Sequence, residues 1–202
     1  MSNSWDDYAE GWDSNQDVRS YSQKAFESLT TEIDIQGLRV LDFGCGTGLL
    51  TEKMVPFAEN IVALDSSEKM CSILRKKGLK NVDILTGFLT ENLIQSEPFL
   101  QKPFDLIVAS SVLAFIDDYV SMLKILKSFL CRGGFLVQWD WKKSEREPDF
   151  GFDSDDLKKG FQHASLTIIS TTEPFSLESE NGAMAVIMGI AKNEGCFRQR
   201  SK

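Results

Sequence analysis

The chain has 202 residues, a length that suits one domain with a sizeable buried core. Its 22 basic and 30 acidic side chains give a net charge of −8, which disfavours binding to nucleic acids or anionic membranes. The longest apolar runs, 106–116 and 183–191, are too short to cross a bilayer, and the first residues have no secretory signal pattern. We therefore expect no nucleic-acid partner, no membrane span and a cytoplasmic location.

The cysteines lie far apart, at positions 45, 71, 131 and 196, and His163 is the only histidine. The chain has no CxxC pair and no histidine near a cysteine, a pattern that predicts neither a zinc site nor a redox dithiol. We expect reduced thiols and no metal. The single imidazole excludes any mechanism that needs two.

The first half of the chain alternates short apolar runs with amphipathic stretches. Arg39–Phe43 is a predicted strand that runs into glycines, and Pro56 marks the last turn of the helix that follows. Ser66 or Ser67 is suited to begin the next helix and Gly78 to end it, because these residue types cap helix ends. In chain order, the expected elements are strand Arg39–Phe43, helix Thr47–Phe57, strand Asn60–Leu64, helix Ser67–Lys77 and strand Val82–Thr86.

The second half continues this alternation and then changes. Phe104–Ala109 is almost continuously apolar, which predicts a strand buried on both faces. Asp117–Leu130 has apolar side chains spaced by three to four residues, as in an amphipathic helix. The expected elements are helix Glu91–Phe99, strand Phe104–Ala109, helix Asp117–Leu130, a turn at Gly133–Gly134, strand Phe135–Trp139, helix Ser154–His163 and strands Leu166–Thr171 and Ala183–Ala191.

Strands that alternate with helices indicate a mostly parallel sheet with helices on both faces. The last two strands have no helix between them, so we expect them to form an antiparallel hairpin at the C-terminal edge. The predicted fold is therefore α/β, a doubly wound sheet of seven strands in a single domain that spans residues 1–202.

The segment Val40–Leu50, VLDFGCGTGLL, is a buried strand that runs into glycines from which a helix begins. Gly44, Gly46 and Gly48 let a ligand approach closer than a Cβ allows, and the helix N-terminus presents free N–H groups to it. Asp65 ends the next strand, 21 residues after Gly44, where a carboxylate is placed to accept hydrogen bonds from both hydroxyls of a ribose. This arrangement predicts a bound adenosine; the alternative is a tight turn with a helix-capping aspartate.

The spacing of the glycines narrows the choice of adenosine compound. Dinucleotide folds use GxGxxG, whereas this chain has GxGxG and no P-loop Gly-Lys-Ser/Thr. Asp42 precedes the loop by two positions, and its carboxylate disfavours a pyrophosphate and favours the ammonium of an amino acid.

Four segments resemble sequence blocks of the class I S-adenosylmethionine-dependent methyltransferases. VLDFGCGTG resembles their first motif, and IVALDSSEKM (61–70) resembles the block after their second strand. FDLIVASSVLAFIDD (104–118) is similar to the fourth-strand block, and LKSFLCRGGFLVQW (126–139) to the helix, turn and fifth strand that follow. The resemblance implies a Rossmann-like cofactor-binding core over 36–141, with S-adenosylmethionine as cofactor and S-adenosylhomocysteine as product. It is nearly silent on the substrate.

The resemblance also implies cofactor-binding residues. Gly44 and Gly46 would run against the methionine part of the cofactor, Asp42 would orient the loop, and Asp65 would hold the ribose hydroxyls. Gly87-Phe88 stands where relatives often have Gly-Asp, so the adenine contact would be apolar and backbone-mediated. The full expected set is Asp42, Gly44, Cys45, Gly46, Gly48, Asp65, Ser66, Met70, Gly87, Phe88 and Ser110.

Other positions of this set have more local roles. Ser66 and Met70 would border the adenine, and Ser110 would lie beside the sulfonium. Cys45 is interpreted as a packing residue of the loop. Many relatives have a histidine where this chain has Ala114-Phe115, which removes histidine-based proton transfer at this point.

The N-terminal SWDDYAEGWDS is similar to the Tyr-Ala-x-x-Tyr-Asp segment of the small-molecule branch of the family, which includes quinone-biosynthesis enzymes. We expect the helical segment 1–35, with Tyr8, Trp12 and Tyr21, to fold over the site as a lid. The alternative is an amphipathic helix that only packs on the sheet. Residues 142–192 would supply a substrate-side loop, a helix and the C-terminal hairpin.

Few residues are candidates to act on the substrate, because displacement at a sulfonium methyl needs mainly alignment and exclusion of water. The alternative for Asp117 and its neighbour Asp118 is a helix cap, and for His163 a solvated helix end. Trp139 and Trp141 would form aromatic walls for a flat or cationic substrate, or Trp139 would belong to the core. The catalytic candidates are Asp117, Asp140, His163 and Tyr21.

The sequence favours an S-adenosylmethionine-dependent methyltransferase that acts on a small molecule. The alternatives are a methyltransferase for a protein partner, a binding protein for this cofactor without catalysis, and a nicotinamide-dependent oxidoreductase. The GxGxG spacing and the absence of a Tyr-x-x-x-Lys pair argue against the oxidoreductase.

Overall fold

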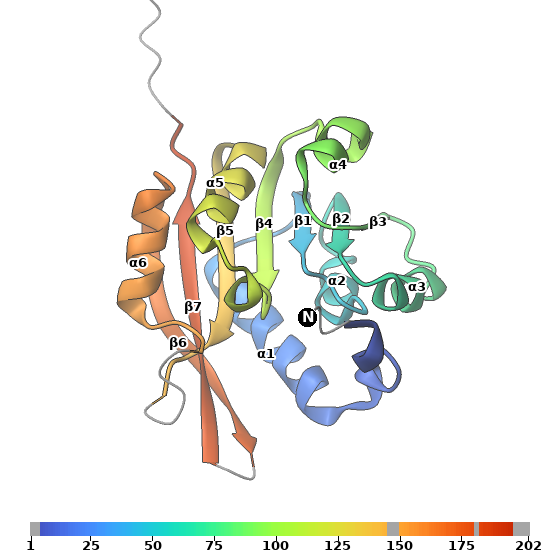
Figure 1. The fold of residues 1–202 in the computed structure, drawn as a ribbon, viewed down its shortest axis with the longest axis horizontal. Helices are drawn as coiled ribbons and strands as arrows, with labels where there is room; N and C mark the ends of the chain where they lie inside the picture. The colour runs from blue at the N-terminus through green and yellow to red at the C-terminus, as the bar shows by residue number, and fades with distance from the viewer. Residues whose placement is uncertain (1–4, 145–149, 180–181, 196–202) are drawn as a thin grey trace, which may run out of the picture.

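The computed structural model describes residues 5–144, 150–179 and 182–195, and its centre is a twisted sheet (Figure 1). In this part of the chain the sheet has seven strands in the order β3-β2-β1-β4-β5-β7-β6. The strands are β1 Arg39–Phe43, β2 Asn60–Asp65, β3 Val82–Thr86, β4 Phe104–Ser110, β5 Leu130–Trp141, β6 Thr167–Ser179 and β7 Gly182–Lys192.

The helices lie between these strands in the chain, as the sequence predicts. The α-helices are α1 Gln16–Glu32, α2 Leu49–Met54, α3 Glu68–Lys76, α4 Glu91–Ser96, α5 Tyr119–Phe129 and α6 Ser154–His163. Short 3₁₀ helices are η1 Trp5–Tyr8, η2 Trp12–Ser14, η3 Pro98–Leu100 and η4 Leu113–Phe115. Within the described ranges, no helix has the length and apolar character that crossing a membrane requires.

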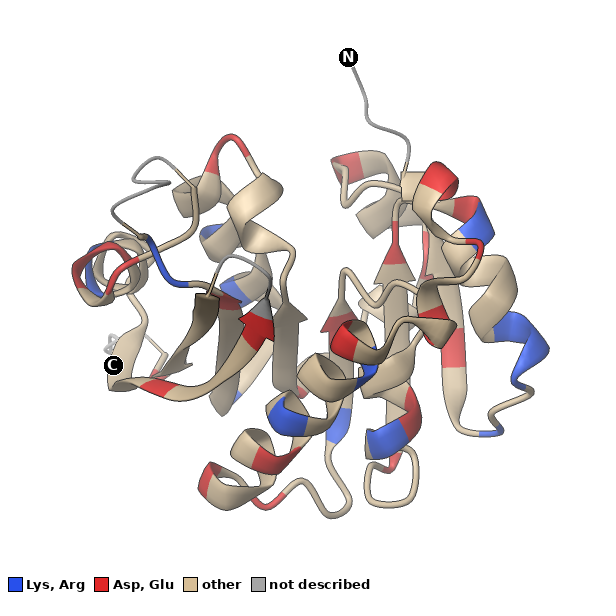
Figure 2. Ribbon diagram, turned by 90° about the horizontal axis from the view of Figure 1, so that it is seen from below, with Lys and Arg blue, Asp and Glu red and all other residues tan. Residues whose placement is uncertain are grey.

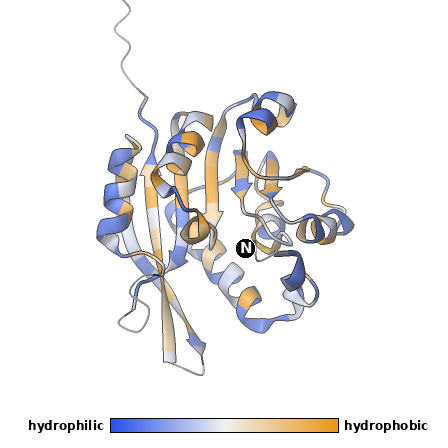
Figure 3. Cartoon of the chain, viewed as in Figure 1, coloured by the Kyte–Doolittle hydropathy of each residue, from blue (hydrophilic) through white to orange (hydrophobic). Residues whose placement is uncertain are grey.

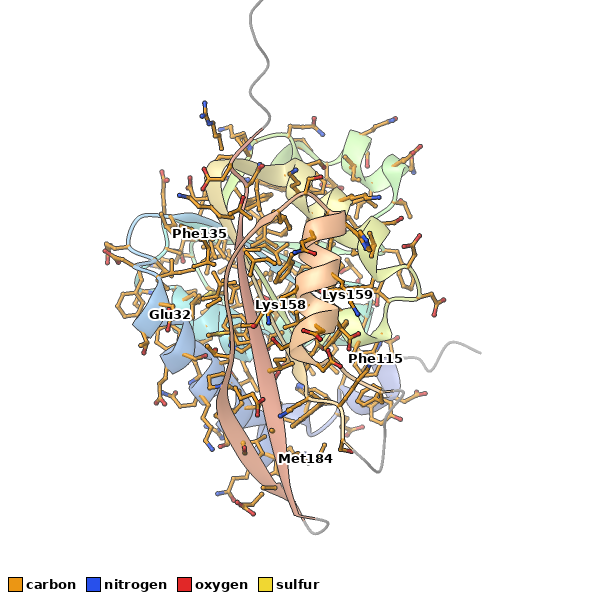
Figure 4. All side chains as sticks on the ribbon, turned by 90° about the vertical axis from the view of Figure 1, so that its left-hand side faces the viewer. Glu32, Phe115, Phe135, Lys158, Lys159 and Met184 are labelled. Carbon is orange, nitrogen blue, oxygen red and sulfur yellow. The ribbon has the colours of Figure 1, made fainter. Side chains whose placement is uncertain are left out.

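The pairing of the strands confirms the predicted α/β, Rossmann-like fold. Strands β1 to β5 pair in parallel, whereas β7 is antiparallel to both β5 and β6. Because β7 lies between β5 and β6, the C-terminal hairpin continues the sheet at the edge that the sequence predicts. The far end of this hairpin, marked by Met184, extends beyond the rest of the sheet (Figure 4).

Three elements differ most in length from the prediction, and the helix expected at Glu91–Phe99 also ends early, at Ser96. The helix expected at Thr47–Phe57 is only Leu49–Met54, because Gly48 is left-handed and cannot continue the helix backwards. β5 already begins at Leu130, and its register with β4 skips residues 131–134, so the predicted glycine turn is a bulge inside the strand. β6 runs on to Ser179 instead of ending at Thr171, with register breaks around Pro174, a residue that only an edge strand accommodates.

Alternate side chains of the strands fill two cores, one on each face of the sheet. The core on one face includes buried side chains of α1 and α2, such as Leu29 and Met54. The other includes α5 and α6, with Leu126 and Phe161. Figure 3 shows the strands as mostly hydrophobic and the outer faces of the helices as mostly hydrophilic. The sheet is therefore buried on both faces, which explains its near-continuous apolar runs.

We expect Gly189→Ala to destabilise the fold by about 1–3 kcal/mol, because the core on this side has no room for a methyl group. A Cβ at Gly189 would lie 2.7 Å from Phe161 Cε2 and 3.0 Å from Leu157 Cδ1. Urea unfolding measures the loss, with Ala183→Ser on the exposed part of the same strand as a control. Equal stability of the two variants would show that α6 does not pack this tightly on β7.

Candidate functional site

The glycine loop lies at the carboxyl end of β1, the edge where ligands of open α/β sheets bind. The N–H groups of Gly44 and Cys45 both donate to Leu64 O, at 2.8 and 3.1 Å, which ties the loop to β2. A Cβ at Gly44 would clash with Val112 at 2.5 Å, and one at Gly48 with Leu74 at 2.3 Å.

Gly46 differs from the other two glycines of the loop. A Cβ built there would meet nothing within 4 Å. Gly44 and Gly48 therefore serve close packing, whereas Gly46 presents its backbone to open space, where a ligand has room.

Asp65, at the end of β2, joins the glycine loop to the start of α3. Its Oδ2 accepts a hydrogen bond from Gly46 N and its Oδ1 accepts one from Ser67 N, each at 2.8 Å. Burial raises the pKa of Asp65 and these backbone bonds oppose the rise. Each carboxylate oxygen still has a lone pair, so the group is held rigidly and retains capacity to accept further hydrogen bonds.

Asp42 lies one strand away and is fully enclosed. Its Oδ2 accepts a hydrogen bond of 2.6 Å from the hydroxyl of Thr51, which fastens α2 to β1. Burial raises the pKa of Asp42 to about 7. The carboxylate thus orients the helix that follows the loop, and its role toward an amino group stays a prediction.

The remaining expected cofactor residues lie around these groups. Gly87 N donates to Asp65 O at 2.9 Å, so the end of β3 adjoins the end of β2. Phe88 is 74% exposed and offers a free ring face, whereas Met70 is buried and reaches a ligand only as part of the floor. Ser66 and Ser110 are half-buried.

The thiol of Cys45 supports its interpretation as a packing residue. It is buried and donates to the carbonyl of Gly46 at 3.6 Å.

The N-terminal segment lies against this edge of the sheet, with η1 beside α3 (Figure 1). Asp6 accepts hydrogen bonds from the hydroxyl of Ser67 and from Lys69 N, the latter at 3.1 Å, and the bond from Ser67 is the main cause of its lowered pKa. The contact from Lys69 uses a free N–H group at the start of α3.

A second acidic residue of the segment holds it to the glycine loop. Asp13 accepts a hydrogen bond from the Thr47 hydroxyl and pairs with Lys77 Nζ at 3.0 Å. Sequence reasoning missed Asp6 and Asp13. The available signal was that residues 1–18 hold five acids and no Lys or Arg. The lid stays a prediction, and these contacts are those a lid would use.

The four catalytic candidates do not lie together. Asp117 is exposed, and its neighbour Asp118 caps α5 by accepting a bond from Ser121 N at 3.0 Å. His163 is exposed at the end of α6, near the amino ends of the strands, where Lys127 Nζ donates to Ser165 O. Figure 1 shows α6 running away from the carboxyl edge. The structure therefore places His163 away from Asp140, and it leaves Asp117 exposed whereas Asp140 is fully buried.

Asp140 and Tyr21 do approach one another, at the carboxyl ends of β4 and β5. Both side chains are buried, and the charge of Asp140 helps raise the pKa of Tyr21. Asp140 Oδ2 accepts a 2.8 Å hydrogen bond from Gln138 Nε2, and burial raises the pKa of Asp140 to about 7. Figure 2 shows acidic stretches at the ends of several central strands.

Gln138 and Tyr119 were missed by sequence reasoning, although Gln138 is a polar residue inside an otherwise apolar strand. Tyr119 OH donates to Gln138 Oε1 at 2.7 Å. Trp139 is not an aromatic wall of the site: it is fully buried, and its indole N–H donates to Ser28 Oγ at 3.0 Å under α1. Trp141 stacks edge-on against Tyr21, with 5.4 Å between ring centres.

In the part of the chain that the structure describes, no group of three or more His, Cys, Asp or Glu side chains is arranged to hold a metal ion.

Comparison with known proteins agrees with the methyltransferase resemblance that the sequence shows in the middle of the chain. Residues 41–138 match the family model described as a methyltransferase domain. A ubiquinone biosynthesis O-methyltransferase of Xanthomonas euvesicatoria pv. vesicatoria is 29% identical over 114 residues, 54% of this chain and 46% of that protein. The chain thus spans about half the length of the curated relatives it matches.

Solved structures of low identity share the fold. The DhpI complex with S-adenosylhomocysteine has a TM-score of 0.71 at 18% identity, over 95% of this chain and 94% of that one. The N-methyltransferase NodS from Bradyrhizobium japonicum WM9, also in complex with S-adenosylhomocysteine, has a TM-score of 0.67 at 18% identity, over 96% and 100%.

We expect Asp42→Asn to stabilise the protein at pH 8, by an amount on the order of a few kcal/mol. Burial raises the folded-state pKa of Asp42 to about 7, so the native carboxyl binds a proton that the unfolded chain has already lost. Its contribution to stability is therefore present below about pH 4 and is lost as the pH rises to about 7.

Urea unfolding of the wild type and Asp42→Asn at pH 5 and pH 8 measures this difference. The gap between the two proteins is expected to widen from pH 5 to pH 8. Asp34→Asn, at an exposed position after α1, serves as the control with no such gap. A gap of the same size at both pH values would contradict a raised pKa.

Proposed function

We propose that this chain, which belongs to the class I S-adenosylmethionine-dependent methyltransferases, transfers a methyl group from S-adenosylmethionine to a small-molecule acceptor. The observation that carries the proposal is the contact between Asp65 and Gly46: a fixed carboxylate adjoins a glycine that faces open space. The match of residues 41–138 to the methyltransferase domain supports it.

The residues present fit the cofactor. Asp65 has free lone pairs for the two ribose hydroxyls, and the exposed ring of Phe88 offers an apolar face for the adenine. Gly44 and Gly46 would border the methionine part, with Asp42 fixing the helix behind the loop. Ser110, half-buried at the end of β4, would lie toward the reacting end.

When bound, S-adenosylmethionine supplies a methyl group on a sulfonium, whose leaving group needs no proton. The protein therefore has to align the acceptor and to exclude water. The N-terminal segment suits both tasks, because Asp6 and Asp13 hold it across the carboxyl edge of the sheet. Its ring contact to Phe115, 5.0 Å from Trp5 between centres, extends this cover to the end of β4.

A small acceptor is favoured over a protein or a nucleic acid. The net charge of −8 disfavours nucleic acid. An N-terminal segment that covers the site, as the predicted lid would, suits a compound small enough to fit beneath it. The names of the relatives include O- and N-methyltransferases, so they do not decide the acceptor atom.

We expect Asp65→Ala to weaken binding of S-adenosylhomocysteine at least about tenfold, measured by isothermal titration calorimetry. The variant loses two hydrogen bonds from ribose hydroxyls to a charged group, each worth roughly 1.5–3 kcal/mol before non-additivity. Glu59→Gln, at an exposed carboxylate before β2, is the control with unchanged affinity. Equal affinity of Asp65→Ala and the wild type would refute the ribose assignment.

Thermal shift of the wild type separates the proposed function from an oxidoreductase. Ligands that bind only the folded state raise the melting temperature. S-adenosylhomocysteine is expected to do so, and NAD and NADP are not. A shift with a nicotinamide cofactor and none with S-adenosylhomocysteine would overturn the proposal.

A further inference from the structure

A cluster of buried and half-buried polar side chains lies at the carboxyl ends of β4 and β5, outside the expected cofactor residues. We call it the acceptor cluster; its members are Tyr21, Ser111, Tyr119, Gln138 and Asp140. They come from α1, the end of β4, the start of α5 and β5. Residues 21, 111–119 and 138–140 are far apart in the chain, so the cluster is a product of the fold.

Asp140 is the charged member, and the hydrogen bonds that it accepts come from neutral amide groups. Its Oδ2 accepts the 2.8 Å bond from Gln138 Nε2, and its Oδ1 accepts a longer bond of 3.4 Å from Ala114 N. None of the ion pairs found among the described residues includes Asp140. A fully buried carboxylate without a cation lowers the stability of the fold. We take this as an indication that Asp140 serves a purpose other than stability.

Tyr21 is the unsatisfied member. Its hydroxyl is buried and has no hydrogen-bond partner of good geometry within the described chain. Burial and the charge of Asp140 raise the pKa of Tyr21, and the nearby side chains of Ser111 and Ser110 oppose this rise although neither makes a hydrogen bond of good geometry to its hydroxyl. An unpaired hydroxyl beside a buried carboxylate is the pattern that a missing ligand leaves.

The other members hold Asp140 in place. Tyr119 OH donates to Gln138 Oε1, and the amide of Gln138 in turn donates to Asp140, so a tyrosine fixes the amide and the amide fixes the carboxylate. Ser111 has a left-handed backbone, φ 52°, and its N–H donates to Trp139 O at 2.7 Å. A residue other than glycine keeps this strained backbone conformation only where its surroundings enforce it, often at functional sites.

Aromatic rings surround the cluster. Tyr119 packs on Phe152 with 4.7 Å between ring centres, and Tyr21 packs on Trp141. Phe115 bridges Trp5 and Phe150, at 5.0 and 5.6 Å, and is 48% exposed. In the view of Figure 4, Phe115 lies on the side of α6 away from the β6–β7 hairpin. Trp141 and Phe152 thus pack directly on the two tyrosines of the cluster.

We infer that the acceptor cluster binds a neutral hydroxyl group on a flat, apolar body, and that Asp140 takes the hydroxyl proton during methyl transfer. The inference rests on the proposed function and adds to it the class of acceptor and a catalytic residue. As the acceptor oxygen bonds to the methyl carbon, its O–H bond breaks. The proton passes to the Asp140 carboxylate, and the electrons of the breaking carbon–sulfur bond stay on sulfur.

The charge of the cluster selects among acceptors. An anionic carboxylate is repelled by Asp140, and an ammonium has no lone pair with which to attack. The other titratable groups that face the cluster are Tyr21 from α1, Tyr119 from α5, and Asp156 of α6, which Lys143 neutralises at 2.8 Å. Burial raises the pKa of Asp140 to about 7, a value that suits a general base near neutral pH.

Calorimetric titration of the complex with S-adenosylhomocysteine tests the inference, with catechol as the probe and benzoate as its anionic counterpart. Catechol is expected to bind and benzoate is not. Catechol affinity should fall about tenfold for each pH unit below about 7, because only the ionised carboxylate binds the hydroxyl. In Asp140→Asn the affinity should be at least about tenfold weaker at pH 8 and independent of pH from 6 to 8.

Two matched variants show whether the effect belongs to the cluster. Tyr21→Phe removes only the unpaired hydroxyl and is expected to weaken catechol a few-fold without changing the pH dependence. Asp155→Asn, an exposed carboxylate of α6, is expected to bind catechol as the wild type does. Unchanged affinity for S-adenosylhomocysteine in each variant shows that the protein is folded.

The remaining outcomes of this experiment would each overturn either the inference or the proposed function. Failure of catechol to bind the wild-type complex, binding of benzoate with equal affinity, or an Asp140→Asn variant with the wild-type pH profile would overturn the inference. A wild type that does not bind S-adenosylhomocysteine would instead overturn the proposed function, so the two failures are distinguishable.

Discussion

The carboxylate of Asp65 joins the two halves of the site, because it binds the glycine loop through Gly46 N and the start of α3 through Ser67 N. Both bonds use backbone donors that β1 and β2 bring to the same edge of the sheet. The loop conformation, the position of α3 and the direction of the remaining carboxylate lone pairs therefore depend on one side chain. Asp6 completes the arrangement from the N-terminal segment by binding the same turn at Ser67.

Two acidic side chains are buried at this edge of the sheet, and burying a carboxylate costs folding free energy. Asp42 and Asp140 are both enclosed, and in both burial raises the pKa to about 7. Their partners differ: Asp42 accepts from the Thr51 hydroxyl, which fastens α2 to β1, whereas Asp140 accepts from Gln138 and from Ala114 N. What sets Asp140 apart is its neighbour, because the buried hydroxyl of Tyr21 beside it has no hydrogen-bond partner among the residues that the structure describes.

The sequence predicts the strands of the central sheet well because their apolar runs are buried on both faces and end at glycines or acids. It predicts length poorly where tertiary contacts decide it: β6 continues to Ser179 because β7 pairs with it throughout. The glycine loop and Asp65 were found because they share a local motif. Asp6 and Gln138 were missed because their partners, Ser67 and Tyr119, are distant in the chain or unremarkable in type, and only the fold brings them together.

The acidic surroundings of the loop bear on turnover under the proposed function. A cofactor with a sulfonium carries one more positive charge than its thioether product, while Asp65 and the adjoining Asp6 keep their own charges through the transfer. The site therefore attracts the reactant more than the product. Loss of that charge weakens only the electrostatic part of binding, because the hydrogen bonds that Asp65 would accept from the ribose hydroxyls are the same in reactant and product.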